Sequence, residues 1–155
     1  MTDAPGHSIF EAVGGEAGLL ALARAWHARC LAPPVVSHAG EGRLHPQHVE
    51  RLAGYWAEAL GGAADYSRTM GNESIVQRMH AGNGAHPEFD AMAVQCFEQA
   101  LVDVGHGAGT RLYATLADYF RWSTTRMTAY PESADHVPAG LVVPRWSWEG
   151  PVVGG

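Results

Sequence analysis

The sequence predicts a single all-α domain, and three observations predict it. Apolar residues recur at helical spacing in several segments, glycine and proline residues separate those segments, and no stretch alternates between apolar and polar residues as a half-buried strand would. The length of 155 residues fits one domain with a core large enough to fold unaided.

Two helices are expected in the first part of the chain. The first covers residues 16–31, where apolar positions follow helical spacing until Pro33-Pro34 stops the pattern. A polar, glycine-containing loop is expected over residues 37–44. The second helix opens at His45-Pro46, because proline suits a first helical turn, and it ends at Gly61-Gly62.

Three further helices are expected. A short one spans about residues 72–80, with Asn72 or Ser74 near its cap, and the glycines around Asn83 break it directly after His80. A long helix opens near His86 and runs to residue 104, and the last one covers residues 110 to about 130.

The chain from residue 131 onward is rich in proline and is expected to be extended. Trp146 and Trp148 are costly to leave in water, so we expect them to pack back onto the helices. A tail that binds a partner or makes a homodimer is the alternative. The sequence therefore divides into a domain at 1–130 and a C-terminal extension at 131–155.

Charge and hydropathy exclude several classes of partner. The net charge is −6 and no cluster of Lys or Arg occurs, which argues against nucleic acid and anionic membrane surfaces. No segment approaches the roughly 18 apolar residues of a membrane span, and the N-terminus lacks the pattern of a secretory signal. A soluble, cytoplasmic protein is expected. Cys30 and Cys96 fall on apolar helix faces and are expected to be reduced core thiols, with a disulfide or redox role as the alternative.

The order of the expected elements and several local strings resemble one family. FEAVGG at residues 10–15, LGG at 60–62 followed by Tyr66-Ser67, and CFEQAL at 96–101 are similar to the group II truncated haemoglobins. The resemblance covers about residues 9–130. It implies a truncated-globin helical sandwich of the two-over-two type, with the tail as an addition, and a non-covalently bound haem b that binds oxygen, nitric oxide or carbon monoxide.

His80 is the expected proximal ligand to the haem iron. A haem needs one neutral imidazole presented from a fixed helix end into an apolar slot, and His80 ends a short helix in which Ile75, Val76 and Met79 can wall the pocket. The alternative is a histidine that merely pairs with the helix dipole. The resemblance also brings Tyr66 and Arg78 near the haem propionates; both would otherwise be ordinary surface residues.

The distal side departs from the family. The position of a ligand-bonding tyrosine holds His27, after Trp26, and His48 takes the distal position on the next helix, with Leu52 one turn later. His48 either donates a hydrogen bond to the ligand or binds the iron itself; otherwise it is solvent-facing. Gly40 replaces a bulky aromatic, which leaves Leu44 as the nearest apolar residue. The characteristic tryptophan aligns with Ala93 or Met92, and Ala93 and Phe97 complete the expected cofactor-lining set.

Reversible gas binding is the favoured function, and redox chemistry with oxygen, peroxide or nitric oxide is possible if a reductase supplies electrons. Whether the chain is an enzyme, a haem-dependent oxidoreductase, is left open by the sequence. The alternative is a haem-free globin-fold interaction module that works through its tail. A non-haem metal site built from His27, His45, His48 and His80 ranks last, because no carboxylate is spaced with these histidines as in helical metal motifs.

Overall fold

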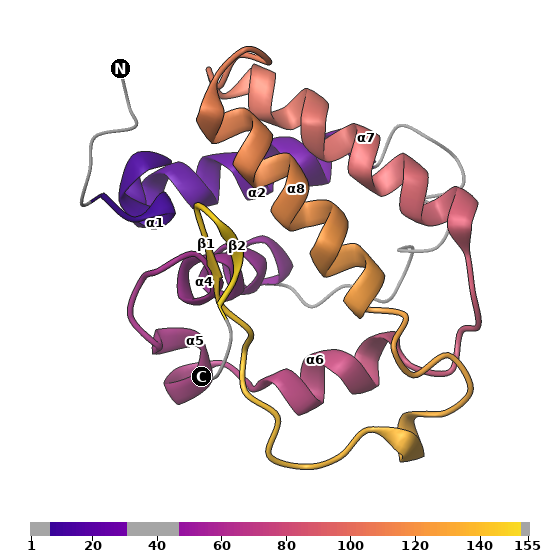
Figure 1. The fold of residues 1–155 in the computed structure, drawn as a ribbon. Helices are drawn as coiled ribbons and strands as arrows, with labels where there is room; N and C mark the ends of the chain where they lie inside the picture. The colour runs from indigo at the N-terminus through magenta and orange to yellow at the C-terminus, as the bar shows by residue number, and fades with distance from the viewer. Residues whose placement is uncertain (1–6, 31–46, 153–155) are drawn as a thin grey trace.

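The protein is described by a computed structural model, in which residues 7–30 and 47–152 are placed (Figure 1). Its elements, in chain order, are α1 (Ile9–Ala12), α2 (Gly15–Cys30), α4 (His48–Ala59), α5 (Asp65–Thr69), α6 (Glu73–His80), α7 (Pro87–Asp103), α8 (Arg111–Arg126), the 3-10 turn η1 (Ala134–His136), β1 (Trp146–Ser147) and β2 (Gly150–Pro151). The all-α prediction is confirmed. No helix of the described ranges is long and apolar enough to cross a bilayer.

Side-chain caps explain where several helices begin. Ser8 and Glu11 form a capping box at α1, in which each side chain accepts a hydrogen bond from the other residue's backbone N–H. The Asn72 side chain accepts from the Ile75 N–H at 2.9 Å and starts α6. The Thr110 hydroxyl accepts from the Tyr113 N–H at 3.1 Å and starts α8.

Four aromatic side chains join the four longest helices. Helix α2 packs against both α4 and α7, and α7 packs against α8. The Phe97 ring of α7 stacks on Phe120 of α8 with centroids 4.2 Å apart, and Trp56 of α4 meets Phe97 edge-on at 5.4 Å. Trp26 of α2 lies 5.6 Å from Phe120. The core therefore lies where these helices cross, as Figure 1 shows.

Three features differ from the sequence prediction. Helix α1 was not expected, because the first helix was predicted to begin at residue 16. Helix α5 was not expected, because its five residues are too few to show a helical period. Helix α8 ends at Arg126 rather than near residue 130. The Thr124 and Thr125 hydroxyls donate to the carbonyls four residues earlier, which weakens the last turn, and Tyr130 precedes a proline, which disfavours helical backbone there. The expected start of the second helix at His45-Pro46 and the expected end of the first helix at Leu31 lie outside the described residues.

The tail returns to the helices. After α8 the tail forms η1, runs past α6 and then continues to the antiparallel pair β1–β2 (Figure 1). The Trp146 ring lies 5.1 Å from that of Trp122 on α8, and the Trp148 indole N–H donates to the His7 carbonyl at 2.8 Å. The Arg111 guanidinium lies 4.8 Å from the Trp148 ring centroid. The division at residues 130 and 131 stays a prediction.

Candidate functional site

His80 is the last residue of α6, and its ring is oriented by the helix itself. The Nδ1 atom lies 2.8 Å from the Val76 carbonyl oxygen, which can only accept, so Nδ1 carries the proton. The lone pair is then on Nε2, the atom that faces away from the helix backbone. The Asn83 side chain donates to the His80 carbonyl at 3.1 Å and closes the end of the helix. The imidazole itself is exposed.

Large apolar side chains stand exposed beside His80. Met79 is 64% exposed and Ile75, one turn earlier on the same face, is 42% exposed. Val76 differs from these two, because its side chain is buried in the core while its carbonyl holds the imidazole. The structure therefore places an apolar strip next to a ligand-competent histidine.

The core side of α6 carries a buried acid that sequence reasoning missed. Glu73 is 1% exposed; its carboxylate accepts from the Tyr55 hydroxyl at 2.7 Å and from the Gln77 amide at 2.8 Å. The Arg126 guanidinium of α8 lies 3.6 Å away. Burial, with the charge of Glu73 nearby, raises the pKa of Tyr55 well above its usual range. This network joins α6 to α4 and α8.

The two expected distal histidines come together. The His27 ring of α2 and the His48 ring of α4 lie 5.5 Å apart between centroids, inclined at 57°, and both residues are half-buried. Leu52, one turn after His48, is half-buried against the core. The packing of α2 on α4 thus produces a pair of imidazoles with an aliphatic neighbour.

Trp26, Ala93 and Phe97 lie in the aromatic core. The Trp26 indole N–H donates to the Ala93 carbonyl at 3.0 Å and ties α2 to α7. Ala93 and Phe97 are 5% and 1% exposed. The only indole proton of Trp26 is therefore already used inside the protein. Contacts of these three residues with a cofactor stay predictions.

Tyr66 and Arg78, the two residues expected near the haem propionates, differ in their exposure to solvent. Tyr66 is 3% exposed, with its ring edge-on to Tyr55 at 5.5 Å. Burial raises the pKa of Tyr66, and the neighbouring Arg51 opposes that rise. Arg51, which also donates to the Met70 carbonyl, was missed because a lone helical arginine looks like a solvated residue. Arg78 is exposed and approaches the Val137 carbonyl at 3.5 Å.

The sequence matches a known protein family. The family described as bacterial-like globin matches residues 8–121. The chain belongs to this family. No curated protein sequence matches the chain significantly.

Solved structures show the same fold for this globin. The group II truncated haemoglobin of Bacillus anthracis superposes with a TM-score of 0.69 at 21% identity, over 83% of this chain and 95% of that one. A thermostable haemoglobin of Thermobifida fusca gives 0.66 at 26% identity, over 81% and 100%. The haemoglobin of Chloroflexus aurantiacus gives 0.65 at 24% identity, over 78% and 97%. The resemblance to the group II truncated haemoglobins and the truncated-globin fold are confirmed.

The residues at the end of α6 fit a haem. A haem iron takes a neutral imidazole whose second nitrogen donates to the protein, as Nδ1 of His80 does to Val76. A porphyrin face needs apolar contacts, and Ile75 and Met79 offer them from the same helix. Leu44, Gly40 and His45 lie outside the described residues. Among the described residues, no group of three or more His, Cys, Asp or Glu side chains is placed to hold a metal ion directly.

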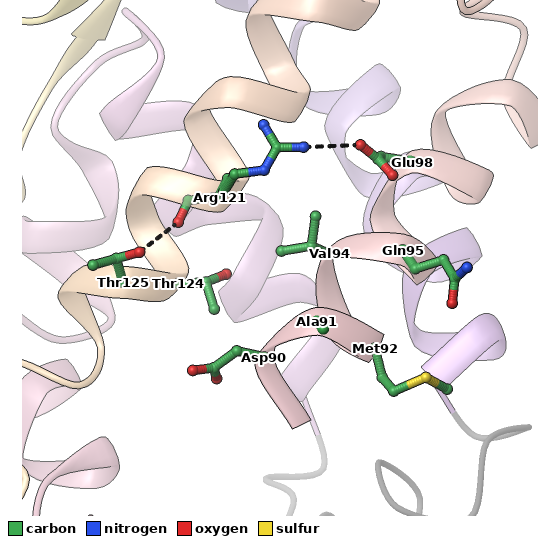
Figure 2. Close-up of a pocket in the computed structure, with 9 residues that line it drawn as sticks. All are labelled: Asp90, Ala91, Met92, Val94, Gln95, Glu98, Arg121, Thr124 and Thr125. Carbon is green, nitrogen blue, oxygen red and sulfur yellow. Dashed lines mark hydrogen bonds and ion pairs between the residues drawn. The ribbon is translucent and has the colours of Figure 1, made fainter. Parts of the chain in front are cut away.

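A groove of about 490 Å³ lies between α7 and α8, and it is a separate feature (Figure 2). An ion pair crosses it, with the Arg121 guanidinium 3.0 Å from the Glu98 carboxylate. The lining residues are Asp90, Ala91, Met92, Val94, Gln95, Glu98, Arg121, Thr124 and Thr125. None of the predicted haem residues lines this groove.

Proposed function

We propose that this globin holds a haem b through His80 and binds a diatomic gas on the opposite side of the iron. The observation that carries the proposal is the hydrogen bond from His80 Nδ1 to the Val76 carbonyl, next to the exposed side chains of Ile75 and Met79. Bound haem supplies gas coordination and one-electron redox chemistry.

The proximal residues orient and shield the group. The Val76 carbonyl fixes the tautomer and the ring plane of His80, and it makes the free Nε2 a better electron donor. Ile75 and Met79 would lie against the porphyrin of a bound haem and keep water from it, which would remove their own exposed apolar area from solvent.

The distal residues supply the polar contacts. His27 and His48 are half-buried, with their ring centroids 5.5 Å apart, and an imidazole N–H is a donor that suits a bound ligand. His48 has a second possible role, as a direct sixth ligand to the iron. Leu52, one turn after His48 on α4, supplies an apolar side chain that packs against the core.

The setting that suits this activity is the cytoplasm. The net charge of −6 and the absence of a basic cluster in the sequence support a globin that meets neither nucleic acid nor a membrane surface. An oxidoreductase activity requires an electron donor, so turnover with oxygen, nitric oxide or peroxide would need a reductase partner. A homodimer stays a prediction.

The experiment that tests the proposal is haem reconstitution followed by visible spectroscopy. The folded protein is titrated with haemin, and ferric, ferrous and carbon monoxide spectra are recorded for the native sequence, His80→Ala and His136→Ala. His136 is an exposed histidine of η1 and serves as the matched control. We expect a sharp Soret band that is lost in His80→Ala and kept in His136→Ala.

Two other results have definite meanings. If the folded native protein takes up no haem, the proposal fails, and the haem-free interaction module takes its place. A six-coordinate low-spin spectrum that becomes five-coordinate in His48→Ala identifies His48 as an iron ligand. A five-coordinate spectrum in the native protein assigns His48 to hydrogen bonding.

A further inference from the structure

The chain that follows α8 is hydrogen-bonded along the whole length of α6. At the start of the helix, the Ser74 hydroxyl donates to the Pro138 carbonyl at 2.7 Å and accepts from the Leu141 N–H at 3.0 Å. Ser74 is 3% exposed, and its two bonds to the tail are partly buried. One side chain therefore fixes a turn of the tail against α6.

The other end of α6 is joined to the beginning of the same segment. The Gly82 N–H donates to the Tyr130 carbonyl at 3.0 Å, and the Gly84 N–H donates to the Pro131 carbonyl at 2.8 Å. Both glycines have positive φ, +78° and +65°, which lets the chain turn sharply after His80. Residues 130–141, named here the tail brace, thus contact α6 from beyond its last residue to its first turn.

The tail brace lies on the side of α6 that faces away from the ligand histidine. Successive helical residues are about 100° apart, so Ser74 is roughly opposite to Val76, and Arg78 is roughly opposite to His80. Ser74 and Arg78 contact the brace, whereas the imidazole of His80 is hydrogen-bonded to the Val76 carbonyl. Figure 1 shows the same arrangement, with the orange and yellow chain passing along α6 and η1 packed against it.

The brace is itself held at both ends. It begins directly after α8, and beyond it the Arg145 guanidinium donates to the Gly62 carbonyl at 3.2 Å. Val143 is buried in the core, and Trp146 packs on Tyr119 and Trp122. A segment fixed at two points and bonded to a helix between them restricts the movement of that helix.

Helix α6 needs such restriction. It has eight residues, which is too short to be stable in isolation, so its orientation depends on tertiary contacts. The core network around Glu73 holds the side of α6 that packs on α4 and α8, and the brace holds another side of the helix. The geometry points to the tail brace as the element that sets the position of His80 relative to the haem iron, with Ser74 as its positioning residue. This inference rests on the proposed haem function.

The test compares Ser74→Ala with Ser133→Ala in the full-length protein. Ser133 lies in the brace, where its hydroxyl caps η1 by accepting from the Asp135 N–H, so Ser133→Ala removes one serine hydroxyl without removing a bond to α6. Resonance Raman spectra of the ferrous haem protein report the iron–histidine stretching band. Transfer of haem to an excess of an acceptor apoprotein gives the dissociation rate.

Loss of a buried hydrogen bond that leaves its partners unsatisfied predicts about tenfold faster haem loss in Ser74→Ala. The iron–histidine band shifts and broadens in the same variant. Ser133→Ala behaves as the native protein, and Ser74→Thr, which keeps the hydroxyl, restores the native band. An unchanged band and haem-loss rate in Ser74→Ala overturn the inference. So does a Ser74→Ala protein that is less stable yet keeps the native band.

Amide hydrogen exchange of residues 73–80 separates this inference from the haem proposal. If the native protein binds no haem, the haem proposal has failed and with it the role at the iron. In that haem-free protein, faster exchange in Ser74→Ala alone supports the brace as the element that holds α6. Equal exchange in the native protein and both variants refutes it.

Discussion

Tyr55→Phe is the sharpest test of how α6 is attached to the core. The substitution removes one hydroxyl, which donates to the Glu73 carboxylate at 2.7 Å, and leaves the ring in place. Glu73 is 1% exposed, so water cannot replace the lost donor, and the carboxylate keeps only Gln77 at 2.8 Å and Arg126 at 3.6 Å. A hydrogen bond to a buried charge contributes about 1.5–3 kcal/mol, so we expect a loss of about 2 kcal/mol in the free energy of unfolding.

The assay is urea unfolding followed by circular dichroism, with Tyr113→Phe as the control for a tyrosine that is half-buried on α8. We expect Tyr113→Phe to stay within about 0.5 kcal/mol of the native protein. A Tyr55→Phe protein that is equally unaffected would refute the view that the Glu73 network stabilises the fold. Glu73→Gln and the double variant complete a cycle whose coupling energy isolates the hydroxyl–carboxylate contact.

Other predictions follow from single contacts. Phe97→Ala leaves a cavity among three aromatic rings and lowers the free energy of unfolding by about 3–5 kcal/mol in the same assay. Cys30 resists iodoacetamide at pH 8 in the folded protein and reacts in urea, because burial raises the pKa of its thiol. The Arg29 guanidinium lowers the pKa of Asp103 from its ordinary 3.8. The pair therefore stabilises the folded protein above pH 3.8, and this stabilisation is lost as the pH falls through the lowered pKa. Asp103→Asn removes the contribution of this pair to the pH dependence of unfolding. Trp148→Phe keeps an aromatic side chain but loses the indole N–H that donates to the His7 carbonyl, and limited proteolysis should cut its tail faster.

The sequence was sufficient for the long helices and for the position of His80 at the end of a short one. Apolar periodicity and the Gly and Pro breaks locate α2, α4, α7 and α8, because those helices bury one face each. His80 could be predicted because it directly precedes a glycine-rich break. Helix α5 could not be predicted, because five residues are too few to show a helical period.

The remaining features depend on contacts between distant residues. Glu73 and Gln77, four residues apart, have the pattern of a solvated helix face, and only tertiary packing buries them. Tyr66 was expected at a solvent edge, whereas the structure places it against Tyr55 and Arg51. The course of the tail rests on Ser74, whose single hydroxyl carries no long-range signal in one sequence.

The indole of Trp26 on α2 stands in for an aromatic side chain that α7 lacks, and this bears on the predicted polar contacts of the distal side. Where the resemblance expects a tryptophan on α7, this globin has Ala93 or Met92, and the indole of Trp26 reaches across from α2 to the Ala93 carbonyl. Helix α2 thus supplies the aromatic side chain, but the indole N–H of Trp26 is already hydrogen-bonded inside the core. We predict that hydrogen bonding to a bound gas falls to His27 and His48. The distance between these imidazoles is fixed by the packing of α2 on α4 rather than by either residue alone.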